Sequence, residues 1–150
     1  MQYREFGRTW SHVSALGLGC MRLPLDDSDY AAQVVEAAIA KRINYLETTA
    51  HYVNGRCQHT VAGGLKGRSR GLIVSGKTGI DEDTTADTYR RDVEQQMGAL
   101  GVDYLESYQV GWFSWEKMPL LTRRGGAPEA LYKARDDRSR GCRAAPLSTA

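Results

Sequence analysis

The stretch "GLIVSGKTGIDEDTTADTYRRDVEQQMGALGVDYLESYQVG", from Gly71 to Gly111, decides the fold class. Its first seven residues form a continuous apolar run of strand length. Residues 83–101 follow with an apolar stripe at helical spacing and end at Gly101, which is an expected C-terminal stop. Residues 102–111 then predict a second strand. A strand, a helix and a strand in this order predict a parallel pair joined by a helical crossover. The helical stripe consists of Tyr89, Val93, Met97 and Leu100.

The chain before this stretch shows the same alternation. Residues 2–7 and 12–19 are short extended pieces, and the intervening "GRTW" indicates a hairpin turn. A helix follows, with Asp27 or Ser28 as its cap. Residues 43–48, "INYLET", predict the next strand. The apolar face of the helix is Ala31, Val34, Val35, Ala38 and Ile39.

Two further helices complete the pattern. Residues 59–67 predict a short, weak helix, because Gly63 and Gly64 each cost about 1 kcal/mol relative to alanine. Residues 125–137 predict the last helix. The order is therefore a hairpin followed by four β-α units, which fits an open doubly wound sheet or part of a β/α barrel. In both architectures the chemistry lies at the carboxyl ends of the strands.

The segment "GLGC" at one of these strand ends first suggests a dinucleotide-binding fingerprint. That fingerprint requires G-x-G-x-x-G opening directly into a helix. Here Gly17 and Gly19 are followed by Arg22, and the predicted helix begins well downstream. The segment is therefore better interpreted as a tight exit from a strand, where glycine is least strained.

Glu47, Tyr52 and Lys77 lie at the ends of two successive predicted strands. A phenol has a reference pKa near 10, and a nearby ammonium group favours the phenolate. A carboxylate paired with that ammonium would hold it in place. Such a trio can donate a proton to a carbonyl oxygen while hydride arrives at the carbon. The alternative is that Lys77 is a solvated strand-end lysine and Tyr52 a packed aromatic.

Composition narrows the class of protein. The 150 residues carry a formal net charge of +2, without an apolar run of membrane-spanning length and without an apolar signal core at the N-terminus. Cys20, Cys57 and Cys142 are odd in number and far apart, as is typical of reduced thiols. We therefore expect a cytoplasmic protein of one domain, with no membrane contact.

The last residues differ from the rest. Residues 133–150 hold five Lys/Arg against two Asp and have no helical or strand period. A nucleic-acid arm is one interpretation, but the segment lacks interleaved aromatic residues, so we expect no nucleic-acid partner and a disordered tail over 138–150. Cys57 and His59 form a pair and not a metal site, and no metal is expected.

Four segments resemble the aldo-keto reductase family, in the family's order and spacing. They are "YREFGRT…VSALGLGCMRLP", "INYLETTAHY", "IVSGKTG" and "YRRDVEQQMGALGVDYLESYQVG". The first resembles bacterial members whose full-length chains carry a C-terminal iron–sulfur segment. The resemblance covers residues 1–137 and implies an N-terminal part of an eight-stranded (β/α)8 TIM barrel, here the hairpin and about four β-α units.

The resemblance also implies a reaction. Members of the family use NADPH to reduce an aldehyde or ketone, with a small-molecule carbonyl substrate. By position, Tyr52 is the proton donor, Lys77 tunes it, and Glu47 stands where the family usually has aspartate. Cofactor binding is assigned to Gly19, Cys20 and Met21 at the end of the first barrel strand.

Two departures from the family bear on activity. Gly111 stands where the family has a histidine, and losing a positioned acid–base group typically costs about 10²–10⁴-fold in rate. A complete barrel also needs about 250 residues, and the family places much of the NADPH site on the later strands. The 150-residue chain alone is therefore expected to be inactive. The alternative functions are a catalytically incompetent half-barrel or a non-catalytic interaction subunit. The aromatic residues Trp112, Phe113 and Trp115 either line a substrate pocket or cover the barrel end.

A half-barrel sheet would leave strand edges open, and open edges invite pairing with another chain. We therefore expect self-association through these edges. Apolar residues of the predicted strands that point inward would also lose packing partners. The candidates are Leu16, Tyr45, Ile73, Val74 and Leu105.

Overall fold

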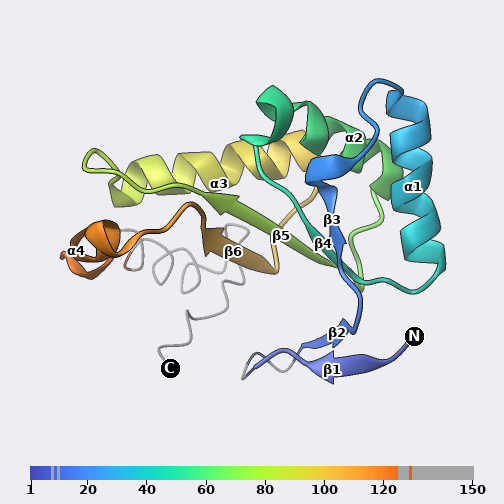
Figure 1. Ribbon diagram of the computed structural model, residues 1–150, viewed down its shortest axis with the longest axis horizontal. Coiled ribbons are helices and arrows are strands. Elements are labelled where there is room, and N and C mark those ends of the chain that lie inside the picture. Colours follow the sequence, from blue (N-terminus) through green and yellow to red (C-terminus); the bar gives the residue numbers. More distant parts are fainter. Residues whose placement is uncertain (8, 10, 125–128, 130–150) are drawn as a thin grey trace.

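The computed structural model describes residues 1–7, 9, 11–124 and 129. A four-stranded sheet forms its centre, and three helices lie on one side of it (Figure 1). The elements in chain order are β1 Tyr3–Glu5, β2 His12–Ser14, β3 Leu18–Gly19, a 3-10 turn Cys20–Arg22, α1 Ser28–Ala40, β4 Tyr45–Glu47, a 3-10 segment Tyr52–Gly55, α2 Arg56–Leu65, β5 Ile73–Thr78, α3 Ala86–Leu100, β6 Ser107–Val110, a 3-10 turn Trp115–Lys117 and α4 Met118–Thr122.

The central sheet has the order β3-β4-β5-β6, and all three pairings are parallel. Each strand therefore neighbours the next one along the chain, as in a β/α barrel, and the prediction of a parallel sheet with helical crossovers is confirmed. β1 and β2 form the predicted antiparallel hairpin. Asn44, just before β4, bonds the hairpin at Ser14 and His12, so the hairpin sits at the amino end of the sheet (Figure 1).

Local signals fix the ends of the two long helices. The Asp27 carboxylate accepts the backbone N–H of Tyr30 at 2.9 Å, which caps α1 as predicted. Thr85 caps α3 and takes part in a capping box with Thr88. Gly101 ends α3 with φ +65°, a left-handed conformation that glycine adopts without strain.

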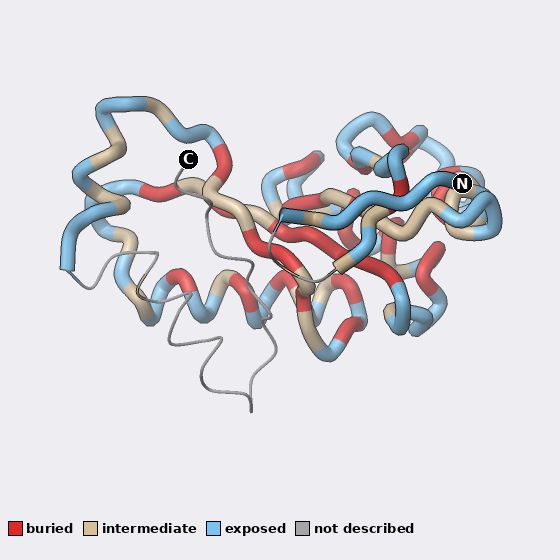
Figure 2. The backbone as a smooth tube through the Cα atoms, turned by 90° about the horizontal axis from the view of Figure 1, so that it is seen from below, coloured by how far each residue is buried: buried red, intermediate tan, exposed pale blue. Residues whose placement is uncertain are grey.

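The core lies between the sheet and the helices. Figure 2 shows buried residues running along the strands in the middle of the molecule, with exposed residues toward the outside. Leu46, Val74 and Leu105 are fully buried, and all three belong to the core cluster. No helix in the described part of the chain is long and apolar enough to cross a membrane.

The expected loss of packing concerns only candidates that point inward, and Val74 and Leu105 do not, because they belong to the core between the sheet and the helices. Val74 and Leu105 are completely buried, and Ile73 is 7% exposed. Leu16 is exposed because it lies in the bend between β2 and β3 and not in a strand. Tyr45 is only half-buried, but its hydroxyl accepts a hydrogen bond from Gln109.

The inner face of the sheet is polar where apolar residues were expected. Gln109 Nε2 donates to the Tyr45 hydroxyl at 3.0 Å and to Ser75 Oγ at 2.9 Å, across three strands. Glu47 and Lys77 share this face through the period-2 alternation of β4 and β5. The face therefore presents few apolar side chains to lose packing.

Helix α2 begins three residues earlier than predicted, and one of its two glycines has a packing role. An added Cβ at Gly64 would lie 2.5 Å from Val35 Cβ and 2.8 Å from the Ala32 carbonyl oxygen. Gly64 is therefore a point where α2 approaches α1 closely, and glycine is needed for that approach. Helix propensity alone misses this, because the compensation comes from tertiary packing.

We predict opposite effects for two adjacent glycine substitutions. Gly64→Ala is expected to destabilise the protein by about 1–3 kcal/mol, because a backbone oxygen cannot yield to the new methyl group. Gly63→Ala is the matched control, since its Cβ would meet Ala32 at an ordinary 3.6 Å. That change is expected to stabilise by about 0.5–1 kcal/mol through helix propensity. Urea unfolding measures both, and equal effects would contradict the packing argument.

The chain beyond β6 contains elements that were not predicted. The 3-10 turn Trp115–Lys117 leads into α4, with Pro119 in its first turn. The helix predicted over 125–137 lies outside the described residues, apart from Glu129, and so does the tail predicted over 138–150.

Candidate active site

The carboxyl ends of β4 and β5 bring two of the predicted site residues together. Glu47 is the last residue of β4 and is paired in register with Ser75, so Lys77 lies two residues further along β5. The Lys77 ammonium and the Glu47 carboxylate form an ion pair at 2.7 Å. Their side chains are only 18% and 21% exposed, so water screens the pair less than it would on the surface.

Tyr52 completes the trio from the loop after β4. The Lys77 ammonium donates to the Tyr52 hydroxyl, which also lies 3.5 Å from Glu47 Oε1. Tyr52 is 9% exposed, and its backbone N–H is bonded to the Thr49 carbonyl. The three residues predicted from strand ends therefore meet at one point, and their chemical roles stay predictions.

The chain turns sharply after Tyr52. Val53, Asn54 and Gly55 have φ values of 51°, 53° and 83°, so three successive residues adopt the left-handed region. Only glycine adopts this region without strain, and the other two indicate a loop held by its surroundings. This loop directs the Tyr52 ring back toward Lys77, whose nitrogen lies 4.7 Å from the ring centroid.

The environment of Lys77 favours its charged form. Burial by itself would lower the pKa of the Lys77 ammonium, but hydrogen bonds to Glu47 and Tyr52, with the Glu47 charge, outweigh it and raise the pKa. The ammonium is therefore a permanent cation at neutral pH. The Tyr52 hydroxyl therefore lies directly against a positive charge.

A cavity of about 340 Å³ opens beside the trio. Among the predicted cofactor residues, Met21 lines it, whereas Gly19 does not and Cys20 is fully buried in the core. Cys20 points its sulfur toward the Leu18 carbonyl and away from the cavity. The cavity is lined by Met21, Arg22, His51, Tyr52, Val53, Lys77 and Trp112.

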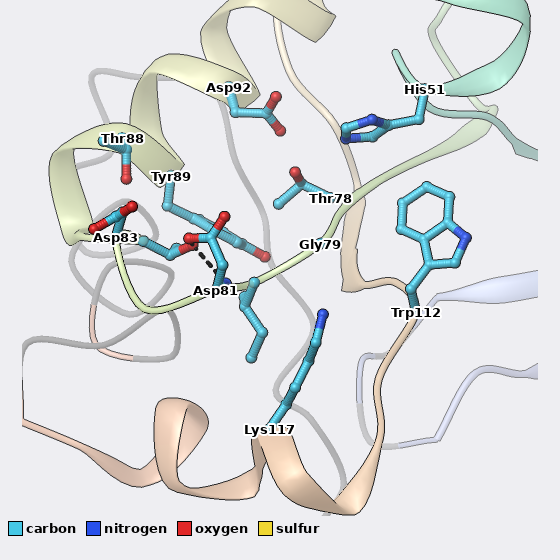
Figure 3. Close-up of a pocket in the computed structure, with 12 residues that line it drawn as sticks. His51, Thr78, Gly79, Asp81, Asp83, Thr88, Tyr89, Asp92, Trp112 and Lys117 are labelled. Carbon is cyan, nitrogen blue, oxygen red and sulfur yellow. Dashed lines mark hydrogen bonds between the residues drawn. The ribbon is translucent and has the colours of Figure 1, made fainter.

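A second cavity, of about 460 Å³, was not predicted from the sequence (Figure 3). His51 and Trp112 line both cavities, and their rings meet edge to face with centroids 5.0 Å apart. In Figure 3 the carboxylates of Asp81, Asp83 and Asp92 lie on the side away from Trp112. The only sequence signal for this cavity is the run of acidic and threonine residues between β5 and α3.

Gly111 lies next to Lys77, directly after β6. A Cβ at this position would be 3.5 Å from Lys77 Cδ, so any side chain here would contact the trio. Of the aromatic residues that follow, Trp112 lines both cavities with a positive φ of 50°. Phe113 and Trp115 are exposed and line neither of these two cavities. Of the three aromatic residues, Trp112 is therefore the one that lines these two cavities.

Cys57 and His59 do not come together as ligands. Cys57 is buried and its thiol donates to the Cys20 carbonyl at 3.1 Å, whereas His59 is exposed. Within the described ranges, no group of three or more His, Cys, Asp or Glu side chains is placed to hold a metal ion.

Known proteins are similar to this chain in sequence and in fold. A model of the "Aldo/keto reductase family" matches residues 15–123. The "uncharacterized oxidoreductase YqkF" of Bacillus subtilis is 29% identical over 119 residues, which cover 73% of this chain and 39% of that protein. An aldo-keto reductase from Bacillus halodurans in its holo form superposes with a TM-score of 0.79 at 25% identity, over 96% of this chain and 50% of that one.

A more distant solved structure shares the fold. An aldo/keto reductase from Klebsiella pneumoniae in complex with NADP and acetate gives a TM-score of 0.72 at 22% identity, over 92% of this chain and 47% of that one. The chain thus spans about half the length of these solved structures, and its four parallel strands correspond to part of a (β/α)8 barrel.

Proposed function

The chain belongs to the aldo/keto reductase family, and on that basis we propose that Tyr52, Lys77 and Glu47 form the proton-donating centre of an NADPH-dependent carbonyl reductase. The observation that carries the proposal is the Lys77 ammonium, bound at once to a phenol and to a carboxylate. Glu47 is one methylene longer than aspartate, yet its carboxylate reaches Lys77 at 2.7 Å. The longer side chain therefore still anchors the cation.

Tyr52, Lys77 and Glu47 can account for the proton transfer in a carbonyl reduction. NADPH, when bound, supplies the hydride that adds to the carbonyl carbon. Tyr52 donates its proton to the carbonyl oxygen as charge develops there, and the C=O double bond becomes an alcohol. Lys77 stabilises the tyrosinate that remains, and Glu47 holds Lys77 in place. Water then returns a proton to Tyr52.

The cavity beside the trio fits this role. Its volume of about 340 Å³ suits a nicotinamide ring or a small carbonyl compound, and the apolar walls of Met21 and Trp112 can pack against a flat ring. Arg22 adds a positive charge that suits an anionic cofactor. We propose a small aldehyde or ketone as substrate, with no nucleic-acid or membrane partner, in the cytoplasm. The free, buried thiols of Cys20 and Cys57 support that location.

The 150-residue chain by itself is proposed to lack turnover. It matches about half the length of its structural relatives, and Gly111 gives the trio no neighbouring imidazole. A catalytically incompetent half-barrel, or an interaction subunit, is therefore the second candidate. Calorimetric titration with NADPH tests this second candidate, because it predicts no binding and measurable binding by the chain would contradict it.

The reductase proposal is tested in a fusion protein that completes the barrel. Residues 1–124 are joined to the second half of the Bacillus halodurans reductase, and NADPH oxidation is followed with a reactive aldehyde. We expect aldehyde-dependent turnover. A fusion that unfolds cooperatively and binds NADPH, but shows no turnover, would contradict the proposal.

We also propose that the isolated chain self-associates through β6. Within the described residues, β6 ends the sheet, and the exposed Phe113 and Trp115 follow it. We expect light scattering after size exclusion to give a mass above that of a monomer, rising with concentration. Replacing both aromatics by serine is expected to lower that mass. Tyr30→Ser is the matched control, because Tyr30 is 56% exposed on α1. A concentration-independent monomer would contradict the proposal.

A further inference from the structure

The backbone of Lys77 lies just beyond the last residue pair of the β4–β5 ladder. β4 pairs with β5 only as far as Glu47 and Ser75, and the Ser75 carbonyl accepts the backbone N–H of Thr48 at 3.0 Å. Carbonyl groups alternate in direction along a strand, so the Lys77 carbonyl points to the same side as that of Ser75. The β4 strand has already ended there.

Two side chains take the place of the missing ladder bond. Thr49 Oγ1 donates to the Lys77 carbonyl at 2.7 Å, and Gln96 Nε2 donates to it at 3.1 Å. Both residues are fully buried. Buried carbonyl groups need such partners, and here the partners come from the loop after β4 and from α3.

The Gln96 amide is itself held from three other positions. Its nitrogen lies 2.8 Å from Asp92 Oδ2 and 2.6 Å from the Tyr108 hydroxyl, and its two hydrogens are shared among these acceptors and Lys77. Its oxygen accepts from Gln58 Nε2 at 2.9 Å. The Lys77 carbonyl and the Asp92 carboxylate can only accept, so they fix which end of the Gln96 amide faces the strand. The network thus ties the helix layer to the backbone of the site lysine.

One atom of this network is unsatisfied. Gln58 is 1% exposed, and its oxygen has no hydrogen-bond partner among the described residues. Leucine at positions 58 and 96 would pack two helices without that penalty. The amide pair therefore contributes something other than packing between α2 and α3.

We propose that Gln96, together with Thr49, is a positioning residue that fixes the backbone of Lys77 and so places its ammonium between Tyr52 and Glu47. The catalytic role of this positioning rests on the proposed function, but the positioning of the Lys77 ammonium itself does not. A small shift of the strand end would carry the ammonium away from the phenol. Misplacement of a reacting group by about 1 Å can cost about 10²-fold in rate.

The test reads the position of Lys77 directly. The full chain is labelled with isotopic lysine, and the NMR signal of the Lys77 methylene next to nitrogen is assigned by its loss in Lys77→Arg. The Tyr52 ring, with its centroid 4.7 Å from that nitrogen, and the Trp112 ring at 6.0 Å are expected to displace this signal from those of the other lysines. Gln96→Met keeps the side-chain volume and removes the amide. We expect the Lys77 signal to lose most of its displacement.

The control is the neighbouring glutamine. Gln95 is exposed on the same helix, and Gln95→Met is expected to leave the Lys77 signal in place. A folded Gln96→Met protein, judged by circular dichroism, with an unchanged Lys77 signal would overturn the proposal. The measurement uses neither NADPH nor substrate. Absence of turnover in the completed barrel would therefore contradict the reductase proposal alone.

A second variant covers the case in which Gln96→Met does not fold. Thr49→Val removes the other donor from the same carbonyl and keeps the shape of the side chain. It also removes the acceptor of the His51 N–H, at 3.4 Å. We expect it to shift the Lys77 signal in the same direction, and Thr49→Ser to restore it. An unchanged signal in Thr49→Val would likewise overturn the proposal.

Discussion

Replacing Tyr52 with phenylalanine is expected to lower aldehyde reduction by about 10²–10⁴-fold in the completed barrel, because the change removes the acid that protonates the carbonyl oxygen. The ring and its packing stay, since only the hydroxyl that contacts Lys77 and Glu47 is lost. The measurement is the rate of NADPH oxidation at saturating aldehyde. The affinity for NADPH, measured by calorimetry, is expected to change little.

Tyr45→Phe is the matched control for this prediction. Tyr45 lies on the same polar face of the sheet, and its hydroxyl contacts Gln109 and not Lys77. Removing it is expected to leave the rate within a few-fold of the parent. Equal losses in the two variants would indicate a general effect on the sheet. A fully active Tyr52→Phe protein would exclude Tyr52 as the proton donor.

The long elements were predictable because their signals are local. Helix α1 has an apolar face at 3.6-residue spacing and an aspartate cap, and α3 has both a periodic stripe and a terminal glycine. Local signals fail where a distant element decides the outcome. Gly64 marked α2 as weak in the sequence, yet it serves the contact with Val35 on α1.

The stripe of α3 shows the same limit in detail. Met97 was expected in the core and is only half-buried, whereas Gln96 is completely buried. An argument from helical periodicity assigns polar residues such as Gln96 to the solvent-facing side of the helix. It contains no information about the buried partners of Gln96, which are Gln58 and the Lys77 carbonyl. A buried polar network becomes visible only when its partners, far apart in the sequence, are brought together.

The candidate site was predictable to a greater extent than the core of the helix layer. The carboxyl ends of neighbouring parallel strands lie at the same rim of the sheet, so residues at successive strand ends are expected to be neighbours. Glu47, Tyr52 and Lys77 are in contact as this argument predicts. Position alone did not give the direction of each side chain. Cys20 stands at the same rim, but its side chain points into the core.

The thiols of Cys20 and Cys57 make the protein sensitive to alkaline conditions. Burial raises the pKa of the Cys20 thiol, and the nearby Cys57 and Glu47 raise it further. Burial also raises the pKa of the Cys57 thiol, with Glu47 in support against the hydrogen bond of Thr48, which lowers it. Both thiols therefore stay protonated in the folded protein at pH values where the unfolded chain has released its protons.

This difference has a definite sign. Below the unfolded thiol pKa of 9.0, both states hold the proton and the contribution to stability is complete. Above it, the unfolded state binds fewer protons than the folded state, so stability falls with rising pH. Each thiol then removes about 1.4 kcal/mol per pH unit. Lys77, whose folded pKa is also raised, adds to the loss above its ordinary 10.5.

We therefore expect the free energy of unfolding to fall between pH 9 and 10.5, by about 1.7 kcal/mol from the Cys20 thiol. Cys57 adds to this loss until its own raised folded pKa is reached. A domain is stable by only about 5–15 kcal/mol, so the loss is a measurable part of the margin. Urea unfolding with a reductant, in a Cys142→Ala background that leaves two thiols, measures the loss. Adding Cys20→Ala and Cys57→Ala is expected to flatten the profile below pH 10.5, because the loss from Lys77 begins only above that pH. A stability that stays level from pH 8 to 10.5 in the parent would mean that the folded thiols ionise as freely as unfolded ones. Such a result would place Cys20 and Cys57 in contact with water and contradict the closed core between β3 and α2.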